Sequence, residues 1–384
     1  MNRITLLIIV LLFSVKGFSQ EASKLDHERL LDFIQTQRYK EAAEYIKSVY
    51  PGEINDDKII SRLGYVYYMN GNLPEAEKNY LLLLKKDTLN KSVLLNLATL
   101  NNRRGNYMVS ADYYKKIIHI DSTMFNVYKQ LAEIGQITKD SNTVYYLKRA
   151  NMLNPIDGDV AYDLSDIYII KKKYKEADSI LNLALQADTT NLVLYRAKAK
   201  LSYATKSYKE LIIICEKLFK GGDYTSIVYK WMGNANFYVK NFRKSINTFL
   251  ELEKQEELEE TALYMIAKSY KSLEDEENAV EYYNRAIKAG TATSESVFYY
   301  YYELGDLYKS MKRSKSSAEA YEKSLQYKEI HFAYYMLATL YDQELRNKIN
   351  ALKYYRKFVN VTGQKAENDE YFIYAKSRIN ELMR

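Results

Sequence analysis

Residues that interrupt helices are scarce in this sequence. Only 3 Pro and 13 Gly occur among 384 residues, and segments that alternate like strands between Gly or Pro are hard to find. Because few residues break a regular backbone, the composition favours long helices. At 47% hydrophobic and 27% charged residues, it is typical of a globular chain and excludes a disordered one.

Cysteine is almost absent. The single residue, Cys215, lies in the apolar stretch "LIIICEKLF". One Cys cannot form an internal disulfide, so the fold must depend on packing alone. The helical apolar spacing around Cys215 predicts a small core residue rather than a reactive thiol.

Residue clusters that carry catalysis are also missing. The three His residues, His27, His119 and His331, are far apart in the sequence, whereas a zinc or Ser-His-Asp site needs clustered partners. No Gly-rich phosphate loop occurs, and no glycosidase-type carboxylate pair can be picked out. The sequence therefore predicts a non-enzymatic protein with no catalytic residue, cofactor or metal.

The first twenty residues differ from the rest of the chain. Arg3 precedes an apolar run from Ile4 to Val15, which is followed by "KGFSQ". A charged start, a short apolar run and small residues predict an export signal over residues 1–20, since a spanning helix needs about 20 apolar residues. An uncleaved anchor is the alternative. We expect export to the periplasm or the cell envelope, and no membrane span in the mature chain.

Charge gives no indication of nucleic-acid binding. The formal net charge is +7 for the whole chain, and loss of Arg3 and Lys16 with the signal lowers it to +5. Such a mild excess over a long chain is not the concentrated basic surface that nucleic acid requires. We expect no nucleic-acid partner.

The sequence contains an internal repeat. A small residue after an apolar one recurs at intervals of 34, 34, 33, 34, 34, 34, 38 and 33 residues. These small residues are Gly64, Ala98, Ala132, Ser165, Ala199, Gly233, Ala267, Gly305 and Ala338. The 38-residue interval indicates an insertion near Ser294–Val297. Self-similarity at such a period is typical of stacked repeat architectures.

Each repeat is predicted to be a pair of helices. Ala76 follows Gly64 by twelve residues, and Tyr80 and Leu83 continue the stripe at helical spacing. Gly71 lies between the two stripes, where a helix end favours a left-handed residue. A Gly or Ala that faces a neighbouring helix lets two backbones approach closely, and the pairs must stack to bury their apolar faces.

This pattern resembles the tetratricopeptide repeat, as in "LGYVY" followed by Ala76 and Tyr80. The resemblance implies an all-α, right-handed solenoid of helix pairs. The domains expected are a signal peptide at 1–20, a degenerate helix pair at 21–56, about nine tandem repeats at 57–365 and a capping helix at 366–384.

The resemblance also implies a protein or peptide partner on the concave face, to which the first helix of each repeat contributes. Tyr combines large contact area with a polar group, and nearby cations suit a segment with apolar and acidic groups. An envelope glycan bound by stacked Tyr is the alternative, and Tyr side chains that simply pack between helices remain a further one. The predicted partner-binding residues are Tyr65, Tyr68, Tyr162, Arg196, Lys200, Tyr203, Lys230, Asn234, Tyr264, Lys268, Tyr299, Tyr302 and Tyr335.

Overall fold

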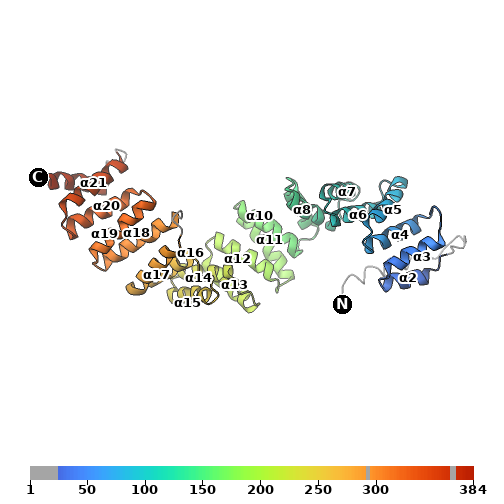
Figure 1. Ribbon diagram of the computed structural model, residues 1–384, viewed down its shortest axis with the longest axis horizontal. Coiled ribbons are helices and arrows are strands. Elements are labelled where there is room, and N and C mark those ends of the chain that lie inside the picture. Colours follow the sequence, from blue (N-terminus) through green and yellow to red (C-terminus); the bar gives the residue numbers. More distant parts are fainter. Residues whose placement is uncertain (1–24, 291–294, 364–368) are drawn as a thin grey trace. The chain divides into compact units, whose positions relative to one another are not determined.

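The computed structural model describes residues 25–290, 295–363 and 369–384, and every regular element among these residues is a helix (Figure 1). The predicted all-α class is therefore confirmed. The expected signal at residues 1–20 lies outside the described residues, as do residues 291–294 at the expected insertion. Among the described helices, none is long and apolar enough to cross a membrane.

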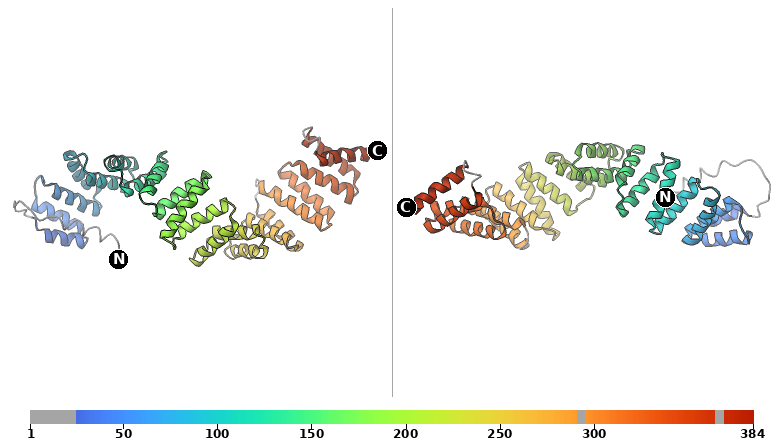
Figure 2. Two further views of the ribbon diagram at one scale, coloured as in Figure 1. Left: turned by 180° about the vertical axis from the view of Figure 1, so that it is seen from behind. Right: turned by 90° about the horizontal axis from the view of Figure 1, so that it is seen from above.

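Contacts divide the chain into two compact units, with the boundary between Pro155 and Ile156. Unit 1 contains α2 (His27–Gln35), α3 (Tyr39–Val49), α4 (Asp57–Met69), α5 (Leu73–Lys86), α6 (Lys91–Arg103), α7 (Tyr107–Ile120), α8 (Phe125–Thr138) and α9 (Thr143–Leu153). Figure 2 shows the paired helices of each unit from two further sides.

Unit 2 begins with α10 and ends with the last helix of the chain. Its helices are α10 (Gly158–Ile170), α11 (Tyr174–Ala187), α12 (Leu192–Ala204), α13 (Tyr208–Lys220), α14 (Ser226–Tyr238), α15 (Phe242–Lys254), α16 (Glu260–Ser272), α17 (Glu276–Ala289), α18 (Glu295–Ser310), α19 (Ser314–Tyr327), α20 (His331–Thr339), the π-helix η2 (Leu340–Glu344), α21 (Lys348–Thr362) and α22 (Glu370–Met383).

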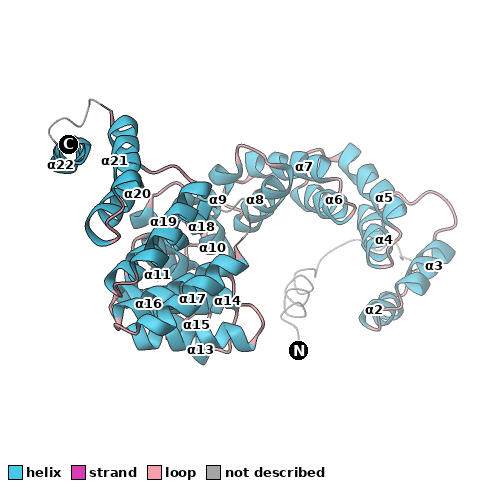
Figure 3. Cartoon of the chain, turned by 60° about the vertical axis from the view of Figure 1, so that its left-hand side comes forward, coloured by secondary structure: helices cyan, strands magenta, loops and turns pink. Residues whose placement is uncertain are grey.

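Helices stack in chain order within each unit. Each helix packs mainly on the one before and the one after it, and first helices of successive repeats also touch, as α10 and α12 do. Loops join consecutive helices (Figure 3). Local packing of this kind is what the sequence period predicts, because one pair cannot bury its apolar stripe without a neighbour.

The recurring small residues lie where two helices approach closely. A Cβ added to Gly64 would come within 2.7 Å of the Tyr80 ring, and one added to Gly233 within 2.6 Å of the Phe249 ring. Phe249 is 1% exposed, so its ring has little room to move. The reason inferred for the small residues is thereby confirmed.

A Ser hydroxyl crosses the same interface in three repeats. It comes twelve residues after the small residue and donates to that residue's carbonyl oxygen. The bonds are Ser110 to Ala98 at 2.8 Å, Ser245 to Gly233 at 2.9 Å and Ser317 to Gly305 at 2.8 Å. Because all three hydroxyls are buried, each bond satisfies a group that would otherwise be costly to bury.

Cys215 lies in the core of unit 2, as its sequence context predicts. It is buried with Leu211, Ile214 and Leu218. Burial raises the pKa of its thiol to about 12, so the side chain is a protonated, inert core group at neutral pH.

A left-handed residue ends the first helix of every repeat. It comes seven residues after the small residue in all of these repeats except the last, where it comes eight after Ala338, and it has φ of +78° at Gly71 and Gly105. Later repeats have a non-Gly residue here, most often Lys, with φ of +57° at Lys172, +58° at Lys206 and +65° at Lys240, whereas Glu274 takes the position with φ of +59°. The turn is therefore conserved in geometry within the chain, although most copies lack the Gly that favours it.

Ion pairs connect helices both within a repeat and between successive repeats. Within one repeat, Lys86 Nζ of α5 lies 2.6 Å from Asp57 Oδ1 of α4, and between repeats Lys271 Nζ lies 2.8 Å from Glu303 Oε2. Similar pairs connect Arg104 with Glu77, Arg196 with Asp223, Lys200 with Asp166 and Arg285 with Glu253. Exposed pairs contribute at most about 1 kcal/mol each, so these contacts fix side-chain positions more than they stabilise the fold.

The last helix, α22, is bound to the π-helix η2 by side-chain hydrogen bonds. Asp342 of η2 accepts hydrogen bonds from Arg378 of α22, with Nε–Oδ2 2.8 Å and Nη2–Oδ1 2.9 Å. Tyr355 also donates to Asp342, at 3.2 Å. The side chain of Asp342 is 6% exposed, and such a two-point pair orients the arginine firmly.

Candidate functional site

The two predicted binding residues of unit 1 lie on α4 and are half-buried. Tyr68 is covered by Arg103, whose guanidinium carbon lies 5.1 Å from the ring centroid and whose Nη1 donates to the Tyr68 carbonyl at 3.1 Å. Burial raises the pKa of Tyr65. Part of the area of both rings is therefore used in packing.

Three of the predicted cations in unit 2 are neutralised by the chain itself. Lys230 Nζ lies 2.8 Å from Glu259 Oε2, and Arg196 and Lys200 pair with Asp223 and Asp166. The Asn234 amide is also occupied, since its Nδ2 donates to the Lys230 carbonyl at 2.8 Å. These side chains have less free charge for a partner than the sequence indicates.

Lys268 is the exception among the predicted cations. Its ammonium lies 5.5 Å from the Phe237 ring centroid and 5.4 Å from that of Tyr264. Within the described parts of the chain it forms no ion pair with a carboxylate. Two aromatic rings therefore hold a half-exposed cation that keeps its charge.

Four Tyr side chains extend from this lysine across four successive first helices. Tyr203 of α12, Tyr238 of α14 and Tyr299 of α18 are 41%, 53% and 48% exposed, and Tyr264 of α16 is half-buried. We call Tyr203, Tyr238, Tyr264 and Tyr299 the tyrosine row.

Burial and neighbouring groups raise the pKa of two members of the tyrosine row. Burial raises the pKa of Tyr203, and the phenol of Tyr238 raises it further. Burial is also the main cause of the raised pKa of Tyr264. The Glu303 carboxylate and the Tyr300 phenol contribute next, and Tyr238 and Tyr299 contribute less. Lys268 contacts the ring of Tyr264 in this row, and we treat the tyrosine row and Lys268 as one candidate surface.

The remaining predicted residues of unit 2 lie apart from the row or are engaged in packing. Tyr162 is 38% exposed on α10. The ring centroids of Tyr302 and Phe298 are 6.0 Å apart. The ring centroid of Tyr335 lies 5.8 Å from that of Phe332 and 5.0 Å from that of Tyr371, in an aromatic cluster that includes residues of α22.

Sequence reasoning missed two members of this surface, Phe237 and Tyr238. Both lie near the end of α14. Phe237 and Tyr238 come four and five residues after the small Gly233, as Tyr203 comes four residues after the small Ala199. Applying the Tyr203 offset to every repeat finds Phe237. Tyr238 is one residue further on, and its exposure is a property of the helix end that the period does not encode.

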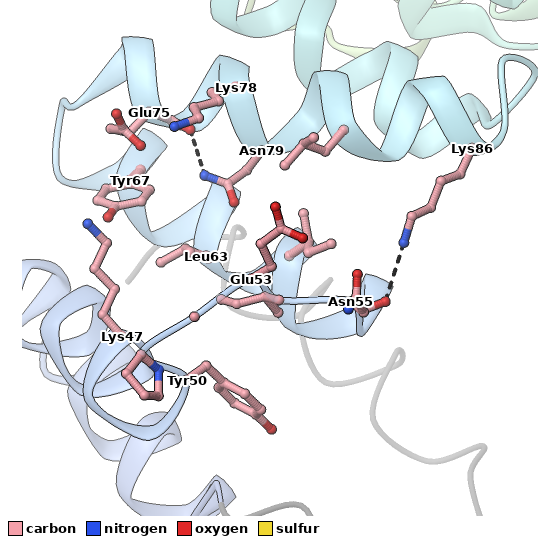
Figure 4. Close-up of a pocket in the computed structure, with 15 residues that line it drawn as sticks. Lys47, Tyr50, Glu53, Asn55, Leu63, Tyr67, Glu75, Lys78, Asn79 and Lys86 are labelled. Atoms are coloured by element: carbon pink, nitrogen blue, oxygen red, sulfur yellow. Dashed lines mark hydrogen bonds between the residues drawn. The ribbon is translucent and has the colours of Figure 1, made fainter.

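A pocket in unit 1 is the second candidate site (Figure 4). Its volume is about 630 Å³, within the range of about 300–1,000 Å³ usual for small-molecule sites. It is formed by α3, α4, α5 and the linker between α3 and α4. Its lining residues are Lys47, Tyr50, Pro51, Gly52, Glu53, Ile54, Asn55, Ile60, Leu63, Tyr67, Glu75, Lys78, Asn79, Leu82 and Lys86.

Comparison with protein families finds tetratricopeptide repeat matches at residues 158–191, 260–289, 298–331 and 333–364. No curated protein matches the chain. Among solved structures, a tetratricopeptide repeat protein from Parabacteroides merdae is 16% identical, with a TM-score of 0.42, and covers 64% of this chain and 96% of its own.

Two further solved structures are similar. The MamA protein is 20% identical, with a TM-score of 0.39, and covers 44% of this chain and 94% of its own. Human IFIT1, solved as a dimer with m7Gppp-AAAA, is 15% identical, with a TM-score of 0.45, and covers 94% of this chain and 97% of its own.

Proposed function

We propose, for a chain that belongs to the tetratricopeptide repeat family, that the tyrosine row and Lys268 bind an extended segment of a partner protein. Repeats of this family are typical of non-catalytic protein-interaction scaffolds. The observation that carries the proposal is an exposed aromatic row around one unpaired cation. Tyr supplies large contact area at a low entropy cost and is enriched in protein interfaces.

The chemistry of this surface favours a partner segment with apolar or aromatic side chains and one carboxylate. Lys268 would pair with that carboxylate, because Arg196, Lys200 and Lys230 already have carboxylate partners. The proposed location is the cell envelope. It rests on the apolar run and small residues at the start of the sequence.

Affinity capture tests this function. Baits would be the unaltered chain, a Tyr203→Ala/Tyr238→Ala/Tyr299→Ala variant, and Tyr224→Ala as control, since Tyr224 is 57% exposed but lies outside the row. We expect the control to retain one discrete envelope protein and the triple variant to lose it. Central interface residues contribute about 2 kcal/mol or more each, so binding to the purified partner should fall at least tenfold.

The second half of the test concerns Lys268. Lys268→Glu should weaken binding to the purified partner, and restoring it should require Lys in place of the partner's carboxylate. Equal capture by all baits would refute the proposal. Retention of the chain on envelope polysaccharide, abolished in the triple variant and without a protein partner, would instead support the glycan alternative.

A further inference from the structure

A long linker lines the pocket of unit 1. Residues 50–56 join α3 to α4, whereas four residues, 87–90, join α5 to α6. The longer linker contributes Glu53 and Ile54 to the pocket lining, together with residues of α5. This feature is independent of the tyrosine row, which lies in unit 2.

The linker is held in place by Lys86. Its Nζ donates to Asp57 Oδ1 at 2.6 Å and to the Asn55 carbonyl at 3.3 Å. In Figure 4 this contact lies at one end of the pocket, and Lys47 with Tyr67 lies at the other. Lys86 therefore positions the pocket wall, and its charge is already compensated.

Charges of both signs are left without ion-pair partners around the pocket. Lys47 lies 5.4 Å from the Tyr67 ring centroid, and its hydrogen bond with Tyr67 and the nearby Glu75 carboxylate raise the pKa of its ammonium. In the described part of the chain, neither it nor Lys78 forms an ion pair, and the same holds for the carboxylates of Glu53 and Glu75. A ligand with only one sign of charge would be attracted by the two lysines and repelled by the two glutamates, or the reverse.

A buried acceptor and an apolar floor complete the pocket. Asn79 is 7% exposed, and its Nδ2 donates to the Glu75 carbonyl at 2.7 Å, which orients the amide (Figure 4). No hydrogen bond is formed by its Oδ1 within the described residues. Ile60 and Leu63 are buried beneath the opening and Leu82 is 42% exposed at its edge.

We propose that this pocket binds a short apolar peptide with free termini. The terminal carboxylate lies between Lys47 and Lys78, and the terminal ammonium lies near Glu53 and the Asn79 Oδ1. Apolar side chains cover Ile60, Leu63 and Leu82. A single amino acid would leave much of the ~630 Å³ unfilled, whereas pockets bury most of a well-fitting ligand.

Calorimetric titration of the full chain with tri-leucine tests the proposal. The probes are tri-leucine with free termini, its N-acetyl form and its C-terminal amide. We expect the free peptide to bind at least fivefold more tightly than either capped form, because each cap removes one charge that the pocket compensates.

Single-charge variants locate the binding. Glu53→Gln should weaken the free peptide and leave the N-acetyl form unchanged, and Lys78→Gln should weaken the free peptide and leave the amide unchanged. Glu44→Gln on α3 and Lys85→Gln on α5 are exposed controls outside this pocket. Absence of binding at millimolar peptide, equal affinity for free and capped forms, or equal effects of the controls would each overturn the proposal.

Discussion

At the scale of single residues, two buried tyrosines at equivalent positions differ in whether the hydroxyl forms a hydrogen bond. Tyr283 and Tyr321 are both 0% exposed. The hydroxyl of Tyr321 donates to Asp306. Burial and the nearby Glu303 carboxylate raise the pKa of the Tyr283 hydroxyl, but this hydroxyl has no hydrogen bond of good geometry among the described residues.

Replacement by Phe should separate the two tyrosines. Tyr283→Phe removes a buried group without a hydrogen bond, so the free energy of unfolding should stay equal or rise. Tyr321→Phe deprives Asp306 of its donor and should lower that free energy by about 1–2 kcal/mol. Urea unfolding of both variants measures the difference, and an equal loss in both would contradict this explanation.

Asp306 makes stability depend on pH. Burial raises the pKa of its carboxyl in the folded chain, although the Tyr321 hydroxyl opposes the shift. A raised folded pKa means that stability is highest below the unfolded value near 3.8 and is lost as pH rises through the folded value. At neutral pH, ionisation of the Asp306 carboxyl therefore lowers the stability of the folded chain.

Asp306→Asn should stabilise the chain at pH 7 and lose this advantage as pH falls towards 4, because Asn stays neutral and still accepts from Tyr321. Asp188→Asn serves as the opposite case. Hydrogen bonds from Thr190 lower the pKa of Asp188, so its contribution is present above the unfolded pKa and is lost as pH falls. Melting temperatures across this pH range would test both signs.

The residues of the candidate surface could be predicted only in part. Period and offset find Tyr203, Tyr264 and Lys268 on the first helices. They do not reveal that Arg196 and Lys230 are paired, because Asp223 and Glu259 lie in the linkers before the following helices. Which cation stays free depends on side-chain distances between repeats, and a repeat pattern does not specify these.

At the scale of helices and turns, the left-handed residues offer a direct test. A non-Gly residue with positive φ costs about 1 kcal/mol relative to Gly. Lys240 has φ of +65° and is exposed. Lys240→Gly should therefore raise the free energy of unfolding by about 0.5–1 kcal/mol, after the greater freedom of Gly in the unfolded chain is included.

Lys240→Ala is the matched control for this turn. It removes the same side chain but keeps the Cβ, so its stability should equal that of the unaltered chain. Chemical denaturation measures all three proteins. A gain in Lys240→Ala equal to that in Lys240→Gly would show that the lysine charge, and not the backbone, sets the stability.

The helices themselves follow from the sequence more completely than the linkers. Small residues at fixed intervals specify where paired helices approach, as the Gly64–Tyr80 and Gly233–Phe249 contacts show. The pocket beside residues 50–56 was not predicted, because the path of a loop depends on contacts such as that of Lys86 with Asp57. Loop conformation has no period to reveal it.

At the scale of the whole molecule, stacking in chain order makes stability local. Each helix of unit 2 depends on its immediate neighbours, as expected for repeat arrays. A defect in one repeat should therefore weaken the adjacent repeats first.

Gly233→Ala tests this locality. Its Cβ would lie 2.6 Å from the Phe249 ring, and such overpacking costs about 1–3 kcal/mol. Hydrogen exchange should accelerate in α13–α16 and stay unchanged in α20–α22. Gly52→Ala, with no atom within 4 Å of the added Cβ, is the control. Uniform acceleration throughout unit 2 would show that it unfolds as one cooperative body.

The π-helix at Leu340–Glu344 shows how such an array tolerates an insertion. Ala338 and the left-handed Arg346 are eight residues apart, one more than in the preceding repeats. One additional residue is thus accommodated inside a helix. Asp342, in this π-helix, binds Arg378 of the terminal helix α22. A sequence alignment of the repeats that allows insertions only in loops would therefore place this repeat out of register with the others.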